Sequence, residues 1–414
     1  MDKTIGQKIG FDNDKYIRIQ SENIKERIAK FSGKLYLELG GKLFDDHHAS
    51  RVLPGFQPDS KLRMFQKISD QIEIVIVISA EDIEKNKVRA DLGITYDEDV
   101  LRLREEFRNR GFFVGSVVIT HYNGQHAADA FRQRLTRMDI KSYVHYLIDG
   151  YPHNVELIAS DEGFGKNDYV KTERPLVIVT APGPGSGKMA VCLSQLYNEH
   201  KHGVEAGYAK FETFPVWNLP LKHPVNIAYE AATADLNDVN MIDPFHLEAY
   251  NKIAINYNRD IEIYPVLNAL FEGIYGNNPY KSPTDMGVNM VGFCISDDEV
   301  CCEASKNEIV RRYYDATNKL ANGACNEAEI SKIQILFNQA KINTCFRRTT
   351  IAAKECLKRT GHTSSAIELE DGTIITAHSS ILLGCSAALL LNVTKYLAGI
   401  DHETKLIPQS MIEP

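Results

Sequence analysis

A glycine-rich segment that ends in a lysine is the part of this chain whose residue types and spacing best suit chemistry. It reads APGPGSGK, follows an apolar run at 176–180 and precedes a segment with helical periodicity. The backbone N–H groups of such a turn can point at an anion, and the N-terminus of the next helix adds positive partial charge. We therefore expect phosphate or another anion to be held by five residues: Gly183, Gly185, Ser186, Gly187 and Lys188.

The segment departs twice from the nucleotide-binding pattern G-x-x-x-x-G-K-[ST]. Pro182 stands at the first glycine, and Met189 stands at the last hydroxyl residue. That hydroxyl normally ligates Mg²⁺, so its absence argues against ordinary Mg–ATP binding. Anion binding, nucleotide binding and a structural glycine turn that lets a strand and a helix pack closely all stay open at this point.

Lys210 and Glu212 lie at the end of the apolar run that follows the helical segment. If this run is a strand of the same sheet, both side chains emerge near one sheet edge. Lys210 would then stabilise a phosphate or a developing negative charge, and Glu212 would act as a base or pair with the lysine. A surface ion pair at the end of a strand is the alternative interpretation.

Asp235 and Arg259 belong to two polar segments farther along the chain. Asp235 lies in a run of carboxylates and amides at 230–246, which would suit a hard cation such as Mg²⁺, although helix capping explains part of it equally well. Arg259 could clamp a phosphate or a carboxylate with two hydrogen bonds. With Lys210 and Glu212, these two residues are the predicted groups for charge stabilisation and proton transfer.

His121 and His126 flank a glycine turn at Gly124. Each could serve acid–base or metal chemistry. Histidines that face solvent or fill a core are more common, and we favour that interpretation for both. No H-E-x-x-H, G-x-S-x-G or catalytic-cysteine signature occurs, so the sequence supports neither a zinc protease of that type nor nucleophilic catalysis.

Alternating apolar and amphipathic segments must position these groups. The apolar runs predict strands at 34–39, 72–79, 113–120, 143–147, 176–180 and 205–210, with helices between them, for example at 97–110 and 127–138. Short apolar strands separated by helices predict a layered α/β fold whose mostly parallel sheet is buried on both faces. Ligands of such sheets usually bind outside the carboxyl ends of the strands, where the turns at 40–42, 121–124 and 181–188 are expected.

Helices predominate after about residue 241, at 244–257, 263–274, 297–321 and 327–340. A smaller unit follows, with a helix at 349–359, a hairpin with strands at 366–369 and 373–376 around Asp371-Gly372, and an apolar helix at 380–397. We therefore predict three domains. An α/β domain with a P-loop-like turn spans 1–240, a mainly helical domain spans 241–344, and a small α+β domain, incomplete if the chain is cut short, spans 345–414.

Composition narrows the classes of partner. The chain has 414 residues and a formal net charge of -8, without a dense run of Lys and Arg. We therefore expect neither nucleic acid nor a membrane surface as partner. No apolar stretch approaches the roughly 20 residues of a membrane-spanning helix, and the eight scattered cysteines favour a reduced, cytoplasmic setting.

Several long segments closely resemble a bacterial family that is common in Gram-positive organisms and known only as a domain of unknown function, DUF 1846. They include GKLYLELGGKLFDDHHASRVLPGF, GSVVITHYNGQHAADAFR, VTAPGPGSGKMA and EAATADLNDVNMIDPFH. The family similarly has an apolar residue after Gly-Ser-Gly-Lys, so the resemblance implies that Met189 is a family feature. It also implies a cytosolic protein with an α/β domain, a helical region and a smaller α+β domain, but no established reaction. Family members usually run longer than this chain.

These residues favour an enzyme that binds a phosphorylated small molecule or nucleotide through the loop from Gly183 to Lys188. We expect the protein to form a homo-oligomer. The alternative is a non-catalytic anion-sensing, nucleotide-sensing or scaffold protein whose helical region mediates oligomerisation. The cofactor is left undetermined among phosphate, a nucleotide and Mg²⁺, and the residues that would bind a metal are left unknown.

Overall fold

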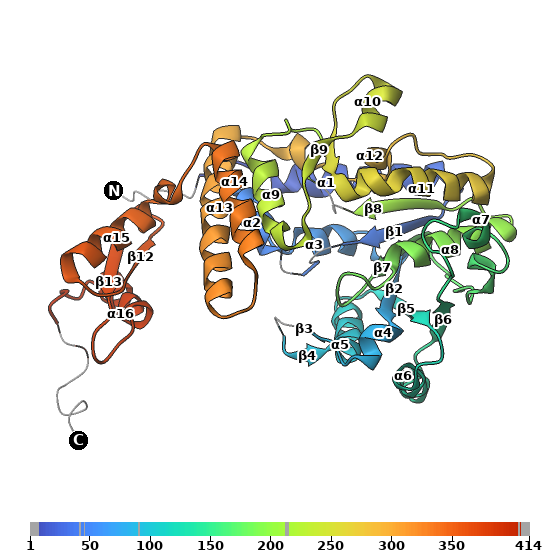
Figure 1. The fold of residues 1–414 in the computed structure, drawn as a ribbon, viewed down its shortest axis with the longest axis horizontal. Coiled ribbons are helices and arrows are strands. Elements are labelled where there is room, and N and C mark those ends of the chain that lie inside the picture. The colour runs from blue at the N-terminus through green and yellow to red at the C-terminus, as the bar shows by residue number, and fades with distance from the viewer. Residues whose placement is uncertain are drawn as a thin grey trace.

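A seven-stranded sheet forms the centre of the computed structural model, which describes residues 8–40, 43–44, 46–89, 92–211, 215–404 and 406. Its strand order is β11-β8-β1-β7-β2-β5-β6, and every neighbouring pair is parallel (Figure 1). This confirms the predicted α/β fold. The strands are β1 (Leu35–Leu39), β2 (Ile72–Ser79), β5 (Phe113–Tyr122), β6 (Ser142–Tyr146), β7 (Leu176–Thr180), β8 (Gly207–Phe211) and β11 (Gly287–Val288).

The two strands at the middle of the sheet are the most apolar. β7 and β2 are buried at every position, because helices cover both faces of a parallel sheet. Each fully buried Val or Ile contributes about 1.5–3 kcal/mol relative to an exposed one. The sheet therefore gives a rigid base for the turns that follow its carboxyl ends.

Helices between the strands pack on this sheet. α8 contacts β1, β7 and β8, while α5 contacts β2 and β5. The helices of this region are α1 (Asn13–Lys30), α2 (His47–Val52), α3 (Ser60–Gln66), α4 (Ala80–Glu84), α5 (Tyr96–Asn109), α6 (His126–Arg137), α7 (Val155–Ile158), α8 (Lys188–Lys201) and α9 (Pro224–Ala232). A short ribbon of β3 (Val88–Arg89) and β4 (Ile94–Thr95) precedes α5.

The region after residue 240 is mostly helical, as expected, with one correction. The predicted helix at 244–257 ends at Tyr250, because Asn251 adopts a left-handed conformation with φ of 51°. The rest of that stretch forms β10 (Ile255–Tyr257), which pairs with β9 (Asn240–Ile242). The helices are α10 (Pro244–Tyr250), α11 (Asn258–Tyr275), α12 (Pro283–Met286), α13 (Asp298–Ala321) and α14 (Glu327–Ala340). This region also supplies β11 to the sheet; the three-domain division stays a prediction.

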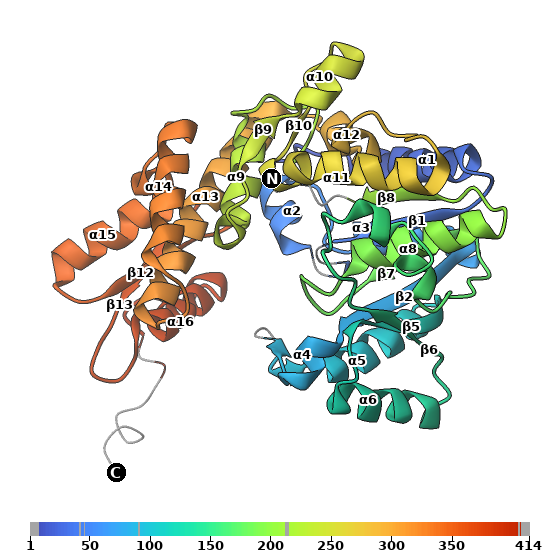
Figure 2. The ribbon, with the colours of Figure 1, turned by 45° about the vertical axis from the view of Figure 1, so that its right-hand side comes forward.

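The C-terminal unit contains a helix, a hairpin and a second helix, as predicted. These are α15 (Arg348–Thr360), β12 (Ser364–Glu368), β13 (Ile374–His378) and α16 (Cys385–Leu397), which begins five residues later than expected. The unit lies beyond α13 and α14, away from the sheet (Figures 1 and 2). Among the described helices, none has the length and hydropathy needed to cross a membrane.

Candidate functional site

The glycine-rich loop leaves the carboxyl end of β7, a strand that lies between β1 and β2. It connects to α8, whose first residue is Lys188. Gly185 and Gly187 have φ values of 75° and 85°. Residues other than glycine rarely adopt this left-handed backbone conformation, so both positions favour glycine.

Two of the loop glycines also have packing roles. A Cβ atom at Gly183 would lie 2.3 Å from the hydroxyl oxygen of Tyr96, and one at Gly187 would lie 3.2 Å from the side chain of Thr120. The Thr120 hydroxyl also donates a hydrogen bond of 2.6 Å to the carbonyl of Ser186. Only Gly185 has open space where a side chain would be. Packing against Tyr96 and Thr120 therefore accounts for glycine at two positions of the loop, without opposing a ligand at Gly185.

Three of the predicted cationic residues gather at the carboxyl ends of β1 and β8. Burial lowers the pKa of Lys188, Glu38 opposes that effect, and the positive charges of Lys210 and Arg259 lower the pKa further. No hydrogen bond or ion pair joins the Lys188 ammonium to another residue within the described ranges. Lys188 is thus a partly buried cation near two others.

Lys210 forms an ion pair with Asp260, a residue in the first turn of α11. Burial opposes the charge of Lys210, but Asp260 and Glu38 outweigh it and raise the lysine pKa. Lys210 and Glu38 are register partners on adjacent strands β8 and β1. Glu212, the predicted base, lies outside the described residues, as do residues 41–42 of the turn after β1.

Arg259 pairs with Asp238, with 3.2 Å between Nε and a carboxylate oxygen. Asp238 is 1% exposed, and burial raises its pKa. Asp235, the acid predicted to serve in charge stabilisation and proton transfer, is exposed in a short turn, where it contributes to the electrostatic environment of Lys332 in α14. Asp238 and not Asp235 is therefore the acid that the fold brings to Arg259.

Glu38 is a site residue that sequence reasoning missed. It lies on β1, next to β7, and one of its carboxylate oxygens accepts a 2.6 Å hydrogen bond from the hydroxyl of Tyr208. A signal was present, since an acid in the run Leu35–Leu39 interrupts an otherwise buried apolar strand. Asp238 and Asp260 gave no such signal, because each lies in a polar stretch with another carboxylate two or three residues away, Asp235 or Glu262.

A cavity of about 590 Å³ lies on the other side of the loop, over the carboxyl ends of β2, β5 and β6. Gly185 and Gly187 form part of its wall. The other lining groups include the last residue of β2, the end of β5 and the segment after β6; they are Ser79, Glu81, Asp82, Lys87, Thr120, His121, His145, Tyr146, Leu147, Ile148, Asp149, Gly150, Tyr151, Phe164, Asn167 and Ala190. The volume lies in the range typical of small-molecule sites.

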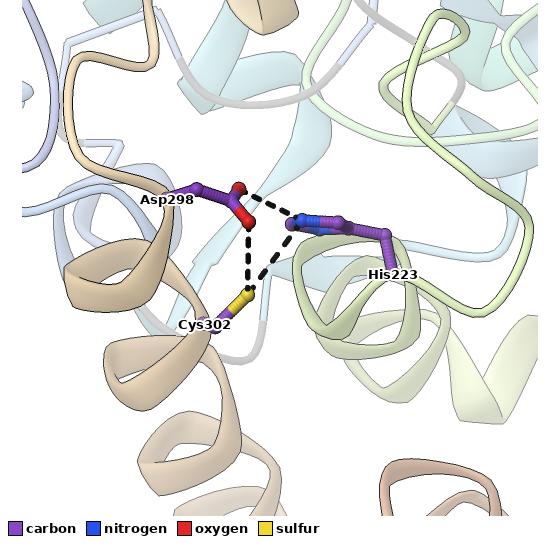
Figure 3. A group of neighbouring side chains, drawn as sticks. All are labelled: His223, Asp298 and Cys302. Atoms are coloured by element: carbon purple, nitrogen blue, oxygen red, sulfur yellow. Dashed lines mark hydrogen bonds and ion pairs between the residues drawn. The ribbon is translucent and has the colours of Figure 1, made fainter.

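A second cluster of polar groups joins α13 to the start of α9 (Figure 3). His223 Nε2 lies 2.9 Å from a carboxylate oxygen of Asp298 and 3.6 Å from the sulfur of Cys302. The Nδ1 atom of His223 accepts a hydrogen bond from the Val225 N–H, so the neutral ring carries its proton on Nε2. A metal would need that nitrogen unprotonated. Burial and Asp298 also raise the pKa of Cys302 to about 11. The proton on Nε2, shared with Asp298, makes the cluster fit a helix contact better than a metal centre.

Fold and loop define an α/β protein with a glycine–lysine turn at the carboxyl edge of a parallel sheet. The chain belongs to the DUF1846 family: the N-terminal model of this domain of unknown function matches residues 9–341, and the C-terminal model matches residues 346–414. It is 58% identical to a UPF0371 protein of Corynebacterium urealyticum over 98% of this chain and 82% of that protein. A UPF0371 protein of Streptococcus thermophilus is 55% identical over 99% of this chain and 83% of its own length.

Proposed function

We propose that this chain binds a phosphorylated small molecule or nucleotide through the loop from Gly183 to Lys188, and acts on it as an enzyme. The observation that carries the proposal is the position of Lys188. It is the first residue of α8, it follows a left-handed glycine, and within the described residues it has no ion-pair partner. A cation at a helix N-terminus beside open glycine backbone favours a phosphate group.

Lys210 and Arg259 support the proposal as neighbouring positive charges. Each is already paired with a buried acid, Asp260 or Asp238, so neither presents an uncompensated charge. They would orient the phosphate oxygens and stabilise charge that develops on them, while Lys188 carries the direct attraction.

Glu38 is the residue that would bind Mg²⁺ in this proposal. A carboxylate on the strand beside the phosphate loop is the kind of ligand that Mg²⁺ takes together with phosphate oxygens. Glu38 fits that role because Tyr208 holds only one of its two oxygens. Glu38 would make up for only part of the contribution of the hydroxyl that is missing at Met189, because a hydroxyl at position 189 would lie on α8 itself.

Calorimetric titration of pyrophosphate and ATP, each with and without Mg²⁺, tests the proposal. Lys188→Ala should weaken binding of a bound probe by about 10–100-fold, the value of a charge-assisted hydrogen bond. Lys201→Ala is the matched control, because this lysine is exposed in the last turn of α8 and pairs with Asp161. Equal affinity of the wild type and Lys188→Ala for both probes would refute the assignment.

The alternative is a non-catalytic sensor or scaffold. The ion pairs of Lys210 and Arg259 favour it, because both cations are neutralised before any ligand arrives. A turnover assay on each compound that binds separates the two. Binding without chemical change of the ligand supports the sensor, whereas release of product supports the enzyme.

A further inference from the structure

The end of β5 holds a histidine in an unusual backbone conformation. His121 has a φ of 51°, in the left-handed region that residues other than glycine adopt uncommonly, Asn, Asp and His more often than the rest. The register between β5 and β6 is irregular between Ile119 and Tyr122, as at a bulge. Bulges beside functional sites re-aim a side chain. Here the carbonyl of His121 also accepts a 3.0 Å hydrogen bond from the side chain of Gln125, which holds the bend.

The ring of His121 is fixed at one nitrogen. Its Nδ1 lies 3.1 Å from the hydroxyl oxygen of Ser79, the last residue of the neighbouring strand β2. Ser79 in turn accepts a 3.2 Å hydrogen bond from the Glu81 N–H. Because Nδ1 is engaged, Nε2 is the ring nitrogen left for a ligand, and no described residue forms a hydrogen bond with it.

His121 lines the 590 Å³ cavity together with Gly185 and Gly187. Its neighbour Thr120 holds the glycine loop through the hydrogen bond to the Ser186 carbonyl. One strand end therefore both braces the predicted phosphate loop and presents an imidazole to the adjoining cavity. The distance between phosphate and imidazole would be set by the sheet and not by a mobile loop.

The cavity also has apolar lining groups beside its polar ones. Tyr146 ends β6, Leu147, Ile148 and Tyr151 follow that strand, and Nζ of Lys87 lies 3.1 Å from a carboxylate oxygen of Asp82. The charged groups that line the cavity with His121 are Glu81, Asp82, Lys87 and Asp149. An apolar lining with a few convergent polar groups suits a sugar or nucleoside, whose ring has apolar faces and hydroxyl edges.

We propose that this cavity holds the hydroxyl-bearing ring of a sugar phosphate or nucleoside phosphate, with His121 Nε2 hydrogen bonded to a ring hydroxyl. The inference rests on the proposed function, since the loop would hold the phosphate of the same ligand. His121 is then the residue that distinguishes a sugar phosphate from inorganic phosphate.

Calorimetry with inorganic phosphate, ribose 5-phosphate and AMP tests the inference on the full chain. The wild type should bind at least one of the two ring-bearing compounds ten or more times more tightly than inorganic phosphate. His121→Asn should remove that preference and keep the affinity for inorganic phosphate, because Asn tolerates the left-handed backbone but lacks the ring. His126→Asn, the same change at an exposed histidine, should leave the preference intact.

Several outcomes would overturn the inference. The first is a wild type that binds neither ring-bearing compound more tightly than inorganic phosphate. The second is a His121→Asn variant that keeps the preference for a ring-bearing compound. The third is a His121→Asn variant that also loses its affinity for inorganic phosphate. Lys188→Ala distinguishes failure of this inference from failure of the proposed function, because under the proposed function it should weaken the binding of all three probes together. If the affinity of AMP relative to inorganic phosphate is higher than that of ribose 5-phosphate, the cavity also accommodates the base. Equal relative affinities indicate that the cavity holds only the sugar.

Discussion

The hydroxyl of Thr120 donates a hydrogen bond to the carbonyl of Ser186, with 2.6 Å between the two oxygens. This contact ties the end of β5 to the glycine loop after β7, across the intervening strand β2. Thr120 is 3% exposed, so the bond is shielded from water. The loop conformation therefore depends on a residue far from it in sequence.

Thr120→Val should destabilise the protein by about 1–3 kcal/mol, because it leaves the buried Ser186 carbonyl without its donor while keeping the side-chain shape. Urea unfolding measures the change. Thr136→Val removes a similar hydroxyl that bonds to Arg132 on the exposed face of α6, and should cost less than about 0.5 kcal/mol. Equal losses in both variants would contradict a bracing role for Thr120.

Gly183→Ala should be destabilising for a reason unrelated to any ligand. Its Cβ would lie 2.3 Å from the Tyr96 hydroxyl oxygen and 2.7 Å from the ring carbon that bears it. Forcing a buried ring aside typically costs about 1–3 kcal/mol. Shortening the neighbour with Tyr96→Leu should make the double variant more stable than the sum of the two single losses predicts, and thermal unfolding of all four proteins measures this. Additive losses would show that the clash is relieved elsewhere.

Asp260→Asn should leave the buried Lys210 ammonium without its main partner. Removing one member of a buried pair costs about 3–5 kcal/mol, less here to the extent that Glu38 compensates. The double variant Lys210→Met with Asp260→Leu should recover much of the loss in urea unfolding. Asp315→Asn, which breaks an exposed pair with Lys319, should cost under about 1 kcal/mol. A similarly small loss for Asp260→Asn would mean that the Lys210 pair contributes little.

His145 should make the protein sensitive to acid. It is 3% exposed, and burial lowers its pKa from 6.5 to about 4. The folded state then binds fewer protons than the unfolded state between these values, so stability falls as the pH drops from about 6.5 toward 4, by at most about 3 kcal/mol from this group.

Unfolding free energies at pH 7.5 and pH 5 measure this effect. His145→Gln keeps an N–H donor for the carbonyl of Asp168 and should lose less stability on acidification than the wild type does. His153→Gln, at an exposed histidine, should show the wild-type difference. An unchanged difference in His145→Gln would assign the acid sensitivity to other groups.

The strands and the loop could be predicted from local sequence patterns, because strand and turn formation depend on nearby residues. The apolar run at 176–180 matches β7, and Lys188 begins α8 as the glycine turn suggested. The pairings of Arg259 with Asp238 and of Lys210 with Asp260 depend on how distant segments meet, which no local period encodes. For the same reason the sequence did not distinguish Asp235 from Asp238. His121 is visible in the sequence as a candidate, but its left-handed backbone is not, so the sequence alone favours a histidine that faces solvent or fills the core.

The place of β7 in the sheet has a consequence for synthesis of the chain. The ribosome makes β1 and β2 well before β7, yet in the finished sheet β7 separates them. Their facing edges pair with β7 and not with each other, so the later strand has to insert between them, and it brings the glycine loop with it. A direct pairing of β1 with β2 would close that gap and exclude the loop. Refolding from denaturant, where all strands are present at once, and folding on the ribosome therefore meet different competing registers.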